Sequence, residues 1–394
     1  MILLQWVFTE CRLMDEKSLG KRNPLVLAAD GLADLPGRVL AWWDAGHEPF
    51  PWRQTTDPYA IWVSEIMLQQ TRAPTVVRYY ERWMAQFPTV TDLAEASLTA
   101  VLKTWEGMGY YARARNLHRA ALQLIERYGR HLPADPQQLQ SLPGIGRYTA
   151  GAIASIAFGQ RVAVLDGNVV RVLARLIDLE VDVTRAATRE GLWALASALV
   201  SATRPGEYNQ ALMELGRTVC RPARPDCVCC PLESCCLARA QGSQLERPVR
   251  PARKRTAHHN VTAAVIWGDP RPGVNGDQPI VLIARRPANA MLGGMWKFPG
   301  GKQREGESLA ECLQREIREE LDFKVSVDCH LVTIEHAYTH FRISLHAFHC
   351  HPVNGEPRPV QVADLRWVTL AELAEYPFPV TDQKIIAALA QSDR

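Results

Sequence analysis

Six of the ten cysteines of this chain lie between Cys220 and Cys236, in the stretch CRPARPDCVCCPLESCC. The spacing Cys220-x6-Cys227-x2-Cys230-x5-Cys236 can be drawn through it, and it leaves Cys229 and Cys235 aside. Four thiolates this close in sequence can surround one compact metal centre, and an iron–sulfur cluster takes four cysteine ligands. Structural zinc takes four cysteines too, but zinc ribbons more often pair two C-x2-C units, and one clean pair occurs here. The spacing therefore favours an iron–sulfur cluster over zinc, with inert thiols as the third interpretation.

The cysteine stretch separates two parts of different pattern. Residues 32–219 contain Ala-rich periodic segments such as ARARNLHRAALQLIERYG, broken at Pro and Gly, which predict an all-α domain. Residues 258–394 mix β-branched runs such as PIVLIARR with one helical segment, which predicts an α+β domain. Between them we expect a metal loop at 220–236 and a Pro-rich basic linker at 237–257. A chain of 394 residues is long for one core, so the predicted fold class is multidomain.

Composition and the N-terminal sequence limit the location of the protein. Residues 1–31 carry no clear motif, and we interpret them as an extension that need not be ordered. They lack the basic region and cleavage site of a signal peptide, and no run of about 18 apolar residues spans a membrane. The cysteines outside the cluster are scattered, unlike a secreted disulfide framework, so we expect a cytoplasmic protein. The net charge of +3 is nearly neutral, so nucleic-acid contacts must come from local basic patches.

A glycine-containing turn lies at residues 142–153, LPGIGRYTAGAI. Gly144 and Gly146 allow close approach of a ligand to the backbone, and the free N–H groups at the start of the following helix suit an anion. An ordinary helix–turn–helix with glycine caps explains the same string, so the turn alone does not decide.

Two carboxylates lie in apolar surroundings. Glu65, in WVSEIMLQQTR (62–72), has apolar neighbours on its helix, and desolvation there would raise its pKa. Asp166, in AVLDGNVVRVLARL (163–176), follows an apolar run and could cap the next helix. Paired carboxylates in separate environments can break a glycosidic bond, one as proton donor and one beside the positively charged sugar. The alternatives are a glutamate on a solvated helix face and a simple N-cap.

Together these stretches resemble the endonuclease III and MutY group of DNA glycosylases. The cysteine spacing resembles the [4Fe–4S] loop of that group, and 142–153 resembles its helix-hairpin-helix, which grips the DNA backbone without reading sequence. The stretches around Glu65 and Asp166 resemble the MutY signature nearly residue for residue. The resemblance implies a [4Fe–4S] cluster on Cys220, Cys227, Cys230 and Cys236.

The resemblance also implies catalytic roles. Glu65 would protonate the adenine base and then handle water, and Asp166 would stabilise or transiently bond the sugar carbon C1′, assisted by Asn168 and Tyr148. Enzymes of this superfamily that cut the strand carry a lysine where this chain has Tyr148, and that lysine attacks the sugar as an amine. The tyrosine therefore predicts a monofunctional glycosylase.

Other positions take DNA-contacting roles by the same resemblance. An enzyme acting on a base must flip it out of the duplex, and inserted side chains offset part of the cost. Arg113 and Arg115 are plausible phosphate contacts as well, by charge and placement. The expected adenine pocket is Trp52, Arg53, Leu68 and Gln210, and the expected wedge and DNA-binding residues are Gln69, Gln70, Thr71, Met108, Tyr110, Gly144, Gly146 and Arg147. Taken without the resemblance, such aromatics and leucines are more often simply core.

Residues 301–323, GKQREGESLAECLQREIREELDF, resemble the Nudix box. Glu316, Glu319 and Glu320 fall on one helix face, where clustered carboxylates suit Mg²⁺; the alternative is a solvated helix with interspersed arginines. Asp322 stands where the box has glycine, which weakens the motif, although Asp tolerates a left-handed turn. MutY proteins carry a Nudix-like domain that recognises 8-oxoguanine, so we favour recognition over nucleotide hydrolysis.

The stretch HAYTHFRI (336–343) supports the recognition interpretation, because Tyr338, Thr339 and His340 match the loop in which family members contact 8-oxoguanine. The expected partner is double-stranded DNA with 8-oxoguanine·A or G·A mispairs, bound by a nucleoid-associated monomer. Four alternatives remain: a Nudix hydrolase whose N-terminal half only binds DNA, a glycosylase whose Nudix box also hydrolyses oxidised nucleoside triphosphates, an endonuclease III-like lyase, and a non-catalytic DNA-binding metalloprotein.

Overall fold

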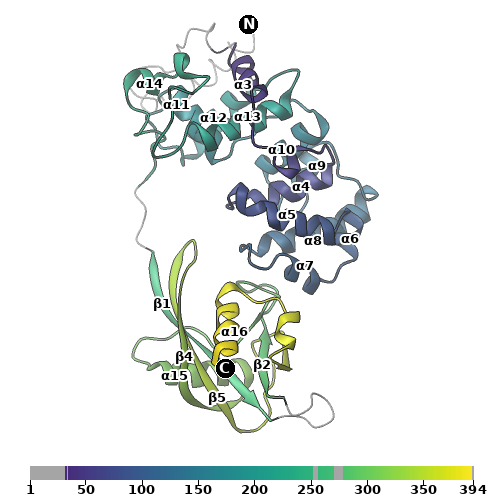
Figure 1. Cartoon of the computed structure of the whole chain (residues 1–394), viewed down its shortest axis with the longest axis vertical. Coiled ribbons are helices and arrows are strands. Elements are labelled where there is room, and N and C mark those ends of the chain that lie inside the picture. Colours follow the sequence, from purple (N-terminus) through teal and green to yellow (C-terminus); the bar gives the residue numbers. More distant parts are fainter. Residues whose placement is uncertain (1–31, 33, 252–255, 270–277, 393–394) are drawn as a thin grey trace. The chain divides into compact units, whose positions relative to one another are not determined.

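The computed structural model describes residues 32, 34–251, 256–269 and 278–392 (Figure 1). The expected extension at 1–31 and residues 252–255 of the expected linker lie outside these residues. Two compact units divide the chain: unit 1 falls within Met1–Met84 and Ala120–Arg253, and unit 2 within Ala85–Arg119 and Lys254–Arg394. A helical part followed by an α+β part confirms the predicted fold class, whereas the exact domain limits stay predictions.

The helical part contains α3 (Leu35–Asp44), η1 (Pro51–Arg53), α4 (Pro58–Leu68), α5 (Ala73–Gln86), α6 (Val90–Glu95), α7 (Leu98–Thr104), α8 (Ala112–Tyr128), α9 (Pro136–Gln140), α10 (Arg147–Phe158), α11 (Gly167–Leu176), α12 (Ala186–Leu199), α13 (Pro205–Thr218), η2 (Glu233–Cys235) and α14 (Leu237–Gln241). Its segment Val90–Thr104 belongs to unit 2. None of the helices that the structure describes is long and apolar enough to cross a membrane.

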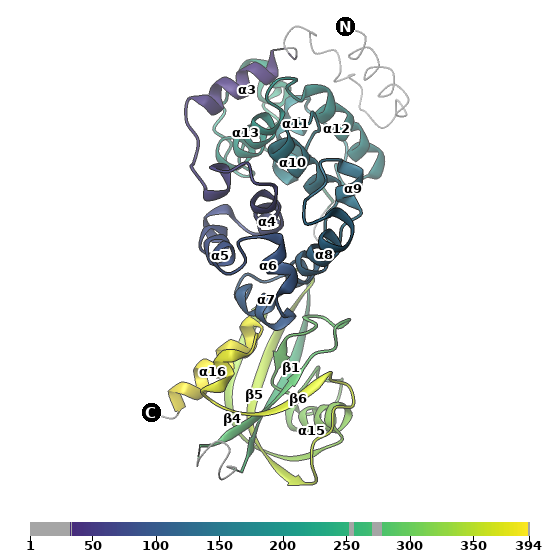
Figure 2. The same ribbon diagram turned by 90° about the vertical axis from the view of Figure 1, so that its right-hand side faces the viewer.

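Helix α4 lies at the centre of unit 1. Its sequence PYAIWVSEIML is apolar around the whole circumference, and residues 59–67 are all buried. Asp57 begins the helix by accepting the backbone N–H groups of Tyr59 and Ala60. The helix packs against α10, and α10 and α11 both pack against α13 (Figure 2). Burial of α4 on every side leaves its one carboxylate inside the protein.

A close helix contact brings α11 and α13 together. Gly216 of α13 faces Asn168 at the start of α11, and a Cβ on Gly216 would lie 2.6 Å from the Asn168 Cβ. Any larger residue would push the two helices apart. Glycine at this position therefore sets where the N-terminus of α11 lies.

Part of the expected linker packs on unit 1. Residues 237–241 form α14, the Val183 N–H donates to the Val249 carbonyl, and the buried Arg247 pairs with Asp178 at 2.9 Å. Residues 237–249 of the expected linker are therefore packed against unit 1 and do not form a free tether, because the Arg247 guanidinium pairs with Asp178 there.

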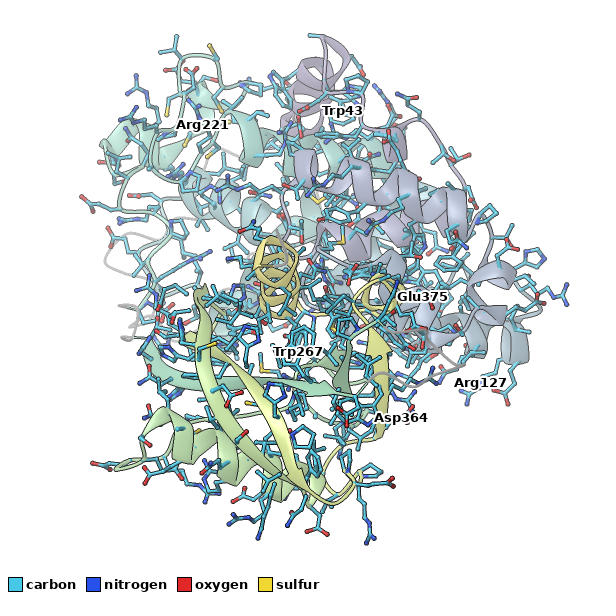
Figure 3. All side chains as sticks on the ribbon, turned by 60° about the horizontal axis from the view of Figure 1, so that its bottom comes forward. Trp43, Arg127, Arg221, Trp267, Asp364 and Glu375 are labelled. Carbon is cyan, nitrogen blue, oxygen red and sulfur yellow. The ribbon has the colours of Figure 1, made fainter. Side chains whose placement is uncertain are left out.

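The α+β part is built on β1 (Ala257–Gly268), β2 (Ile280–Arg285), β3 (Trp296–Lys297), α15 (Leu309–Leu321), β4 (Lys324–Ala337), β5 (Phe341–Asn354), β6 (Asp364–Thr369), η3 (Glu372–Glu375) and α16 (Val380–Ser392). The sheet order is β3-β2-β1-β5-β4, with β6 also pairing with β2, and the β1–β5 pair is parallel. Alternate residues of β1 enter different cores: Ala263 and Val265 pack on the side of α16, and Ala264 and Ile266 on the side of α15. Figure 3 labels Trp267, near the end of β1, which stacks on His349 of β5.

Candidate active site

The two expected catalytic carboxylates lie in one site in unit 1. Glu65 projects from the middle of α4 with 4% of its surface exposed. The hydroxyl of Tyr148, in the first turn of α10, donates a 2.8 Å hydrogen bond to Glu65 Oε2 and also contacts Met213 Sδ at 3.1 Å. Asp166 precedes α11 and lines the same cavity. The structure therefore brings together residues that are far apart in sequence.

Asp166 is the N-cap of α11. Its Oδ1 accepts the backbone N–H groups of Asn168 at 2.9 Å and Val169 at 2.7 Å, and its Oδ2 accepts the Asn168 side-chain amide at 2.8 Å. The capping interpretation is thus correct, and it does not exclude catalysis, because the same carboxylate lines the cavity. A cap held by three donors fixes the carboxylate in place.

Burial sets the protonation of Glu65. It raises the pKa of the Glu65 carboxyl to about 7; the hydrogen bond from Tyr148 opposes the rise, the charge of Asp166 adds to it, and Arg53 opposes it. Burial also raises the pKa of Asp166, against the hydrogen bonds from Val169 and Asn168. A carboxyl that still holds its proton near neutral pH is suited to act as a general acid.

Tyr148 stays protonated in this site. Burial raises the pKa of its hydroxyl well above the ordinary value, and the charges of Glu65 and Asp166 raise it further. A neutral hydroxyl can donate to only one acceptor at a time, and Glu65 is its carboxylate partner. Tyr148 therefore orients Glu65 and cannot serve as an anionic base near neutral pH.

The carboxylates open on a cavity of about 810 Å³. Ten residues predicted from the sequence line it, namely Trp52, Arg53, Glu65, Leu68, Gln70, Thr71, Tyr148, Asp166, Asn168 and Gln210. Of the residues predicted beside them, Gln69 is not in the lining; its side-chain amide donates to the Thr149 hydroxyl at 3.2 Å. Gln70 has φ 58°, a left-handed conformation that is strained for this residue type and turns the chain at the cavity edge.

One wall of the cavity, formed by α13, was largely not predicted from the sequence. Gln210, Met213, Glu214 and Arg217 lie at helical spacing along α13, and all four line the cavity. Only Gln210 had been named. The i, i+3, i+4, i+7 pattern was available in the sequence, but without the position of α13 a buried Glu214 cannot be told from an exposed one.

Glu214 joins two arginines at this wall. Its Oε2 accepts from Arg53 Nη2 at 2.8 Å and from Arg217 Nε at 2.9 Å, and Arg217 also pairs with Glu48. The Arg53 guanidinium carbon lies 4.9 Å from the ring centroid of Trp43, which Figure 3 labels, and 5.0 Å from that of Phe50. Arg53 is thus held by aromatic rings and by one buried carboxylate.

The predicted helix-hairpin-helix is formed by α9, the turn at 142–146 and α10. Gly144 has φ 82°, which a residue with a side chain rarely adopts, and Gly146 is the N-cap of α10 with no side-chain cap bond. The backbone N–H groups at the start of α10 therefore have no side-chain cap, as an anion site requires. Arg147 is half-exposed, lies over the Trp193 ring at 4.2 Å and pairs with Glu190 at 2.9 Å.

Four cysteines surround one small space in the loop that follows α13. Cys220, Cys227, Cys230 and Cys236 line a common cavity, and Cys229 and Cys235 are not in its lining. Among the described residues no three His, Cys, Asp or Glu side chains converge on one point as a single ion requires. A four-iron cluster needs one cysteine per iron around a shared space, so the four residues chosen from spacing fit such a cluster.

Two buried arginines connect this loop to α11. Arg175 Nη1 donates to the Arg221 carbonyl at 2.8 Å and approaches Cys220 Sγ at 3.3 Å; Arg221 is labelled in Figure 3. Arg171 donates to the Cys220 carbonyl at 2.7 Å and to Asn168 Oδ1 at 2.8 Å. A continuous set of hydrogen bonds therefore runs from the cysteine loop through Arg171 and Asn168 to the catalytic carboxylate.

The remaining DNA-contacting predictions lie in unit 2. Met108 is buried, whereas Tyr110 is 44% exposed with φ 49°. The Tyr110 hydroxyl lies 3.0 Å from the Thr339 hydroxyl, so the structure brings the predicted wedge and lesion loop together within this unit. Arg113 is buried against the rings of Trp105 and Tyr110, which differs from the phosphate contact expected of it.

The predicted lesion loop is the turn between β4 and β5. Thr339 and His340 are exposed at its tip, and Tyr338 packs into the core on the α16 side, with its ring 4.8 Å from that of Phe341. The tyrosine is therefore an anchor for the turn, and the two residues after it are the accessible ones.

The Nudix box carboxylates are each paired with a cation of the protein. The buried Lys297 ammonium pairs with Glu320 and donates to the Gly300 carbonyl at 2.9 Å. Arg315 pairs with Glu316 at 2.8 Å and with Glu319 at 3.3 Å. As arranged, these carboxylates do not converge on one point and do not fit a single Mg²⁺. The glycosylase reaction proposed for this chain uses no Mg²⁺ ion.

The left-handed turn expected at the end of the box is confirmed. Asp322 ends α15 with φ 49° and ψ 42°, and its N–H donates to the Arg318 carbonyl. Asp replaces glycine here at a tolerable steric cost.

A helical domain with a helix-hairpin-helix and two carboxylates at one cavity is typical of a DNA glycosylase, and the family model described as "HhH-GPD superfamily base excision DNA repair protein" matches residues 63–197. A second model, "NUDIX domain", matches residues 274–388. The adenine DNA glycosylase of Mus musculus is 37% identical over 384 residues, which cover 85% of this chain and 73% of the relative. The chain belongs to the adenine DNA glycosylase family, and the resemblance stated from its sequence is confirmed.

Two further comparisons agree. The adenine DNA glycosylase of Homo sapiens is 35% identical over 391 residues, 85% of this chain and 70% of that protein. The solved structure of a thermostable thymine-DNA glycosylase is 28% identical with a TM-score of 0.50, and it covers 54% of this chain and 98% of that one. The helical part therefore has the fold of DNA glycosylases.

Proposed function

We propose that this chain is a monofunctional glycosylase that hydrolyses the bond between adenine and deoxyribose in DNA, where adenine lies opposite 8-oxoguanine or guanine. The observation that carries the proposal is the buried Glu65, bonded to Tyr148 and sharing with Asp166 a cavity lined by Trp52 and Leu68. Apolar and aromatic walls suit a flipped base, and two carboxylates in the same cavity suit cleavage of its bond to the sugar.

The first step is proton transfer with bond cleavage. Glu65 gives its proton to a ring nitrogen of adenine, the bond to C1′ breaks, and both bonding electrons leave with the base. Positive charge then develops on the sugar, and the carboxylate of Asp166 stabilises it. Glu65, now ionised, accepts a proton from the water that attacks C1′, so the acid is regenerated in each turnover.

The neighbouring residues keep this pair in place. Tyr148 directs its hydroxyl to Glu65, and Asn168 donates to Asp166. Neither provides an amine nucleophile, so adenine is released while the sugar stays in an intact strand as an abasic site. This is why we propose glycosylase activity without strand cleavage.

Recognition of the opposite base is assigned to the β4–β5 turn. Thr339 and His340 are exposed there and provide a hydroxyl and an imidazole, which can bond the N7–H and O8 edge that distinguishes 8-oxoguanine from guanine. Double-stranded DNA bound through the start of α10 completes the substrate complex. We assign this action to a monomer.

We also propose a [4Fe–4S] cluster on Cys220, Cys227, Cys230 and Cys236. A cluster bound there would cross-link the loop after α13 and so support the hydrogen bonds that Arg171 and Arg175 of α11 make with this loop. All chemical steps remain with the side chains of the cavity.

Substitution of Cys236 by serine is expected to lower the iron and sulfide content of the purified protein strongly, because one ligand of the cluster is lost. The matched controls are Cys229→Ser and Cys235→Ser, which should retain the iron content of the unmodified protein, since neither residue lines the shared cavity. Iron and acid-labile sulfide analysis measures the outcome. Equal loss of iron in Cys235→Ser would show that the ligands are assigned wrongly.

The proposed function is tested with a labelled duplex carrying one 8-oxoguanine·A pair. We expect strand breakage at the adenine only after alkali, because alkali cleaves the abasic site that a monofunctional enzyme leaves. Breakage without alkali would identify a lyase, and no release of adenine from any A-containing mispair by iron-loaded protein would exclude the proposal. A second arm with oxidised nucleoside triphosphates and Mg²⁺ tests the Nudix alternative, for which we expect no hydrolysis.

The pH dependence of the rate follows from the protonation of Glu65. Because the pKa of this carboxyl is about 7 and its protonated form is the active one, the single-turnover rate should be level at lower pH. It should fall as pH rises through about 7, by about tenfold for each further unit. Rates measured from pH 5 to 9 test this. A rate that rises with pH across 7 would show that Glu65 is not the acid.

A further inference from the structure

A buried carboxylate at the cavity wall has no part in the steps above. Glu214 of α13 is 4% exposed and faces two guanidinium groups, and its partner Arg53 lines the same cavity as Glu65. We propose that Glu214 is a positioning residue that holds the Arg53 guanidinium at the cavity and cancels its charge, so that Glu65 keeps the proton it must donate. This inference rests on the proposed function and adds a residue to the same site.

The geometry fixes Arg53 from three directions. Its Nη2 donates to Glu214 at 2.8 Å and its Nη1 to the Glu48 carbonyl at 2.8 Å, and its planar group lies against the Trp43 and Phe50 rings. Of these contacts only Glu214 brings a negative charge to Arg53. The other contacts hold the group in place and leave its charge unbalanced.

The charges at the wall balance as a set. Glu214 and Glu48 face Arg53 and Arg217, so two carboxylates balance two guanidinium groups. Although burial disfavours ionisation of Glu214, the hydrogen bonds from Arg217 and Arg53 hold its pKa below the ordinary value. Glu214 is therefore an anion, and its neutralisation would leave one positive charge uncompensated beside the cavity.

That uncompensated charge would act on Glu65. The groups that face Glu65 are Tyr148 from α10, Asp166 at the start of α11 and Arg53 from η1. Arg53 is the one cation in this set, and it favours the ionised carboxylate. Arg53 is the smallest of the influences on the pKa of Glu65, which burial raises to about 7. The proposal is that the pairing with Glu214 keeps this influence small.

Position matters as well as charge. Arg53 lines the same cavity as the base-binding residues, with donors that suit the ring nitrogens of adenine. Glu214 and Arg217 also line a second cavity, of about 520 Å³, on the side of His47 and Glu48. The Glu214 pairings therefore form the wall between the two spaces and keep Arg53 on the side of the base.

The test is the single-turnover rate of adenine release as a function of pH in Glu214→Gln. Glutamine can still accept from Arg53, so its position is kept and only the charge changes. We expect the fall in rate at high pH to begin about half to one pH unit lower than in the unmodified protein. At pH values above the fall, the variant should therefore be about three- to tenfold slower than the unmodified protein. Near pH 5 the rates should agree.

Three companion variants separate charge from structure. Glu214→Asp keeps the charge and should keep the position of the fall. Glu48→Gln removes an exposed partner of Arg217 but no side-chain bond to Arg53, so it should shift the fall less than Glu214→Gln does. The double variant Glu214→Gln/Arg53→Gln loses one charge of each sign, and its fall should return to the original pH whatever the absolute rate.

The proposal fails if Glu214→Gln lowers the rate by one factor at all pH values and the fall stays in place, because a purely structural residue would do that. It also fails if the double variant keeps the shifted profile. In both cases the unmodified protein still releases adenine. A failure of the glycosylase assignment looks different, because the unmodified protein itself then releases no adenine.

Discussion

Glu65→Gln is expected to lower the single-turnover rate of adenine release by about 10²–10⁴-fold, the range contributed by a positioned general acid. Glutamine has the shape of glutamate, and its carbonyl can still accept the Tyr148 hydroxyl that bonds Glu65 at 2.8 Å. What it lacks is the proton. The rate is measured by quenched single-turnover assays on an 8-oxoguanine·A duplex, and duplex affinity is measured separately.

The same substitution should not weaken the fold. The pKa of Glu65 rises from 4.5 to about 7 on burial, so the contribution of this group to stability is present below pH 4.5 and is lost as pH rises through 7. Above that pH the buried charge costs on the order of 3 kcal/mol, which glutamine does not incur. The free energy of unfolding of Glu65→Gln at pH 8 should therefore equal or exceed that of the unmodified protein.

Glu81→Gln is the matched control for this prediction, because Glu81 is exposed on the neighbouring helix α5. It should leave both the rate and the unfolding curve unchanged. If Glu65→Gln retained more than about a tenth of the rate while binding the duplex normally, the proton would have to come from another group, and the assignment of the acid would be wrong.

Glu65 and Asp166 were predicted to be the catalytic pair from the resemblance of their stretches to the MutY signature. The local patterns alone gave less: apolar neighbours suggested that Glu65 is desolvated, and the Asp-Gly-Asn start of α11 suggested a cap. The structure adds that the two residues share one cavity. The spacing of the cysteines is also a local signal, and the four residues chosen from it line one small space.

Residues whose role depends on distant partners could not be read in this way. Glu214 is buried because Arg53, 161 positions earlier, folds back against it, and no local pattern shows that pairing. Arg113 was expected on DNA because it is a charged residue after a turn, yet its guanidinium is buried against Trp105 and Tyr110. Charge alone does not predict exposure when aromatic rings are available to cover it.

The pairing of the Nudix helix shows the same limit. Spacing correctly placed three glutamates on one face of α15, but the cations that neutralise them come partly from other elements. Lys297 lies on the short strand β3 and reaches Glu320, and Arg304 reaches Glu319 from the loop before the helix. A sequence motif defines which carboxylates cluster, and the surrounding fold decides what they bind.

Asp166→Asn is expected to lower the adenine-release rate by about a hundredfold to a thousandfold, with only a modest change in stability. Asparagine caps helices about as well as aspartate, so its oxygen can still accept the N–H groups of Asn168 and Val169. It removes the negative charge that faces the developing positive charge of the sugar, and that loss acts on the transition state. Rates and unfolding free energies of the same preparations measure the two effects.

The stability cost can be estimated from the bonds that change. In Asp166→Asn the new amide nitrogen would face the Asn168 amide that now donates to Oδ2 at 2.8 Å, so one hydrogen bond is lost, at about 1 kcal/mol. Asp166→Ala loses the backbone cap as well, at about a further 1 kcal/mol. The two variants should therefore differ in stability but share the same large loss of rate.

Asp135→Asn provides the control for cap chemistry, because Asp135 caps α9 through the N–H groups of Gln137 and Gln138 and lies outside the cavity. It should change neither rate nor stability by a measurable amount. If Asp166→Asn kept the full rate while Asp166→Ala lost it in proportion to its stability, Asp166 would be a cap alone, and the charge that stabilises the sugar would have to come from Glu65 after it has given up its proton. The pairing of Asp166→Asn with Asp166→Ala therefore decides whether one carboxylate in this cavity has one function or two.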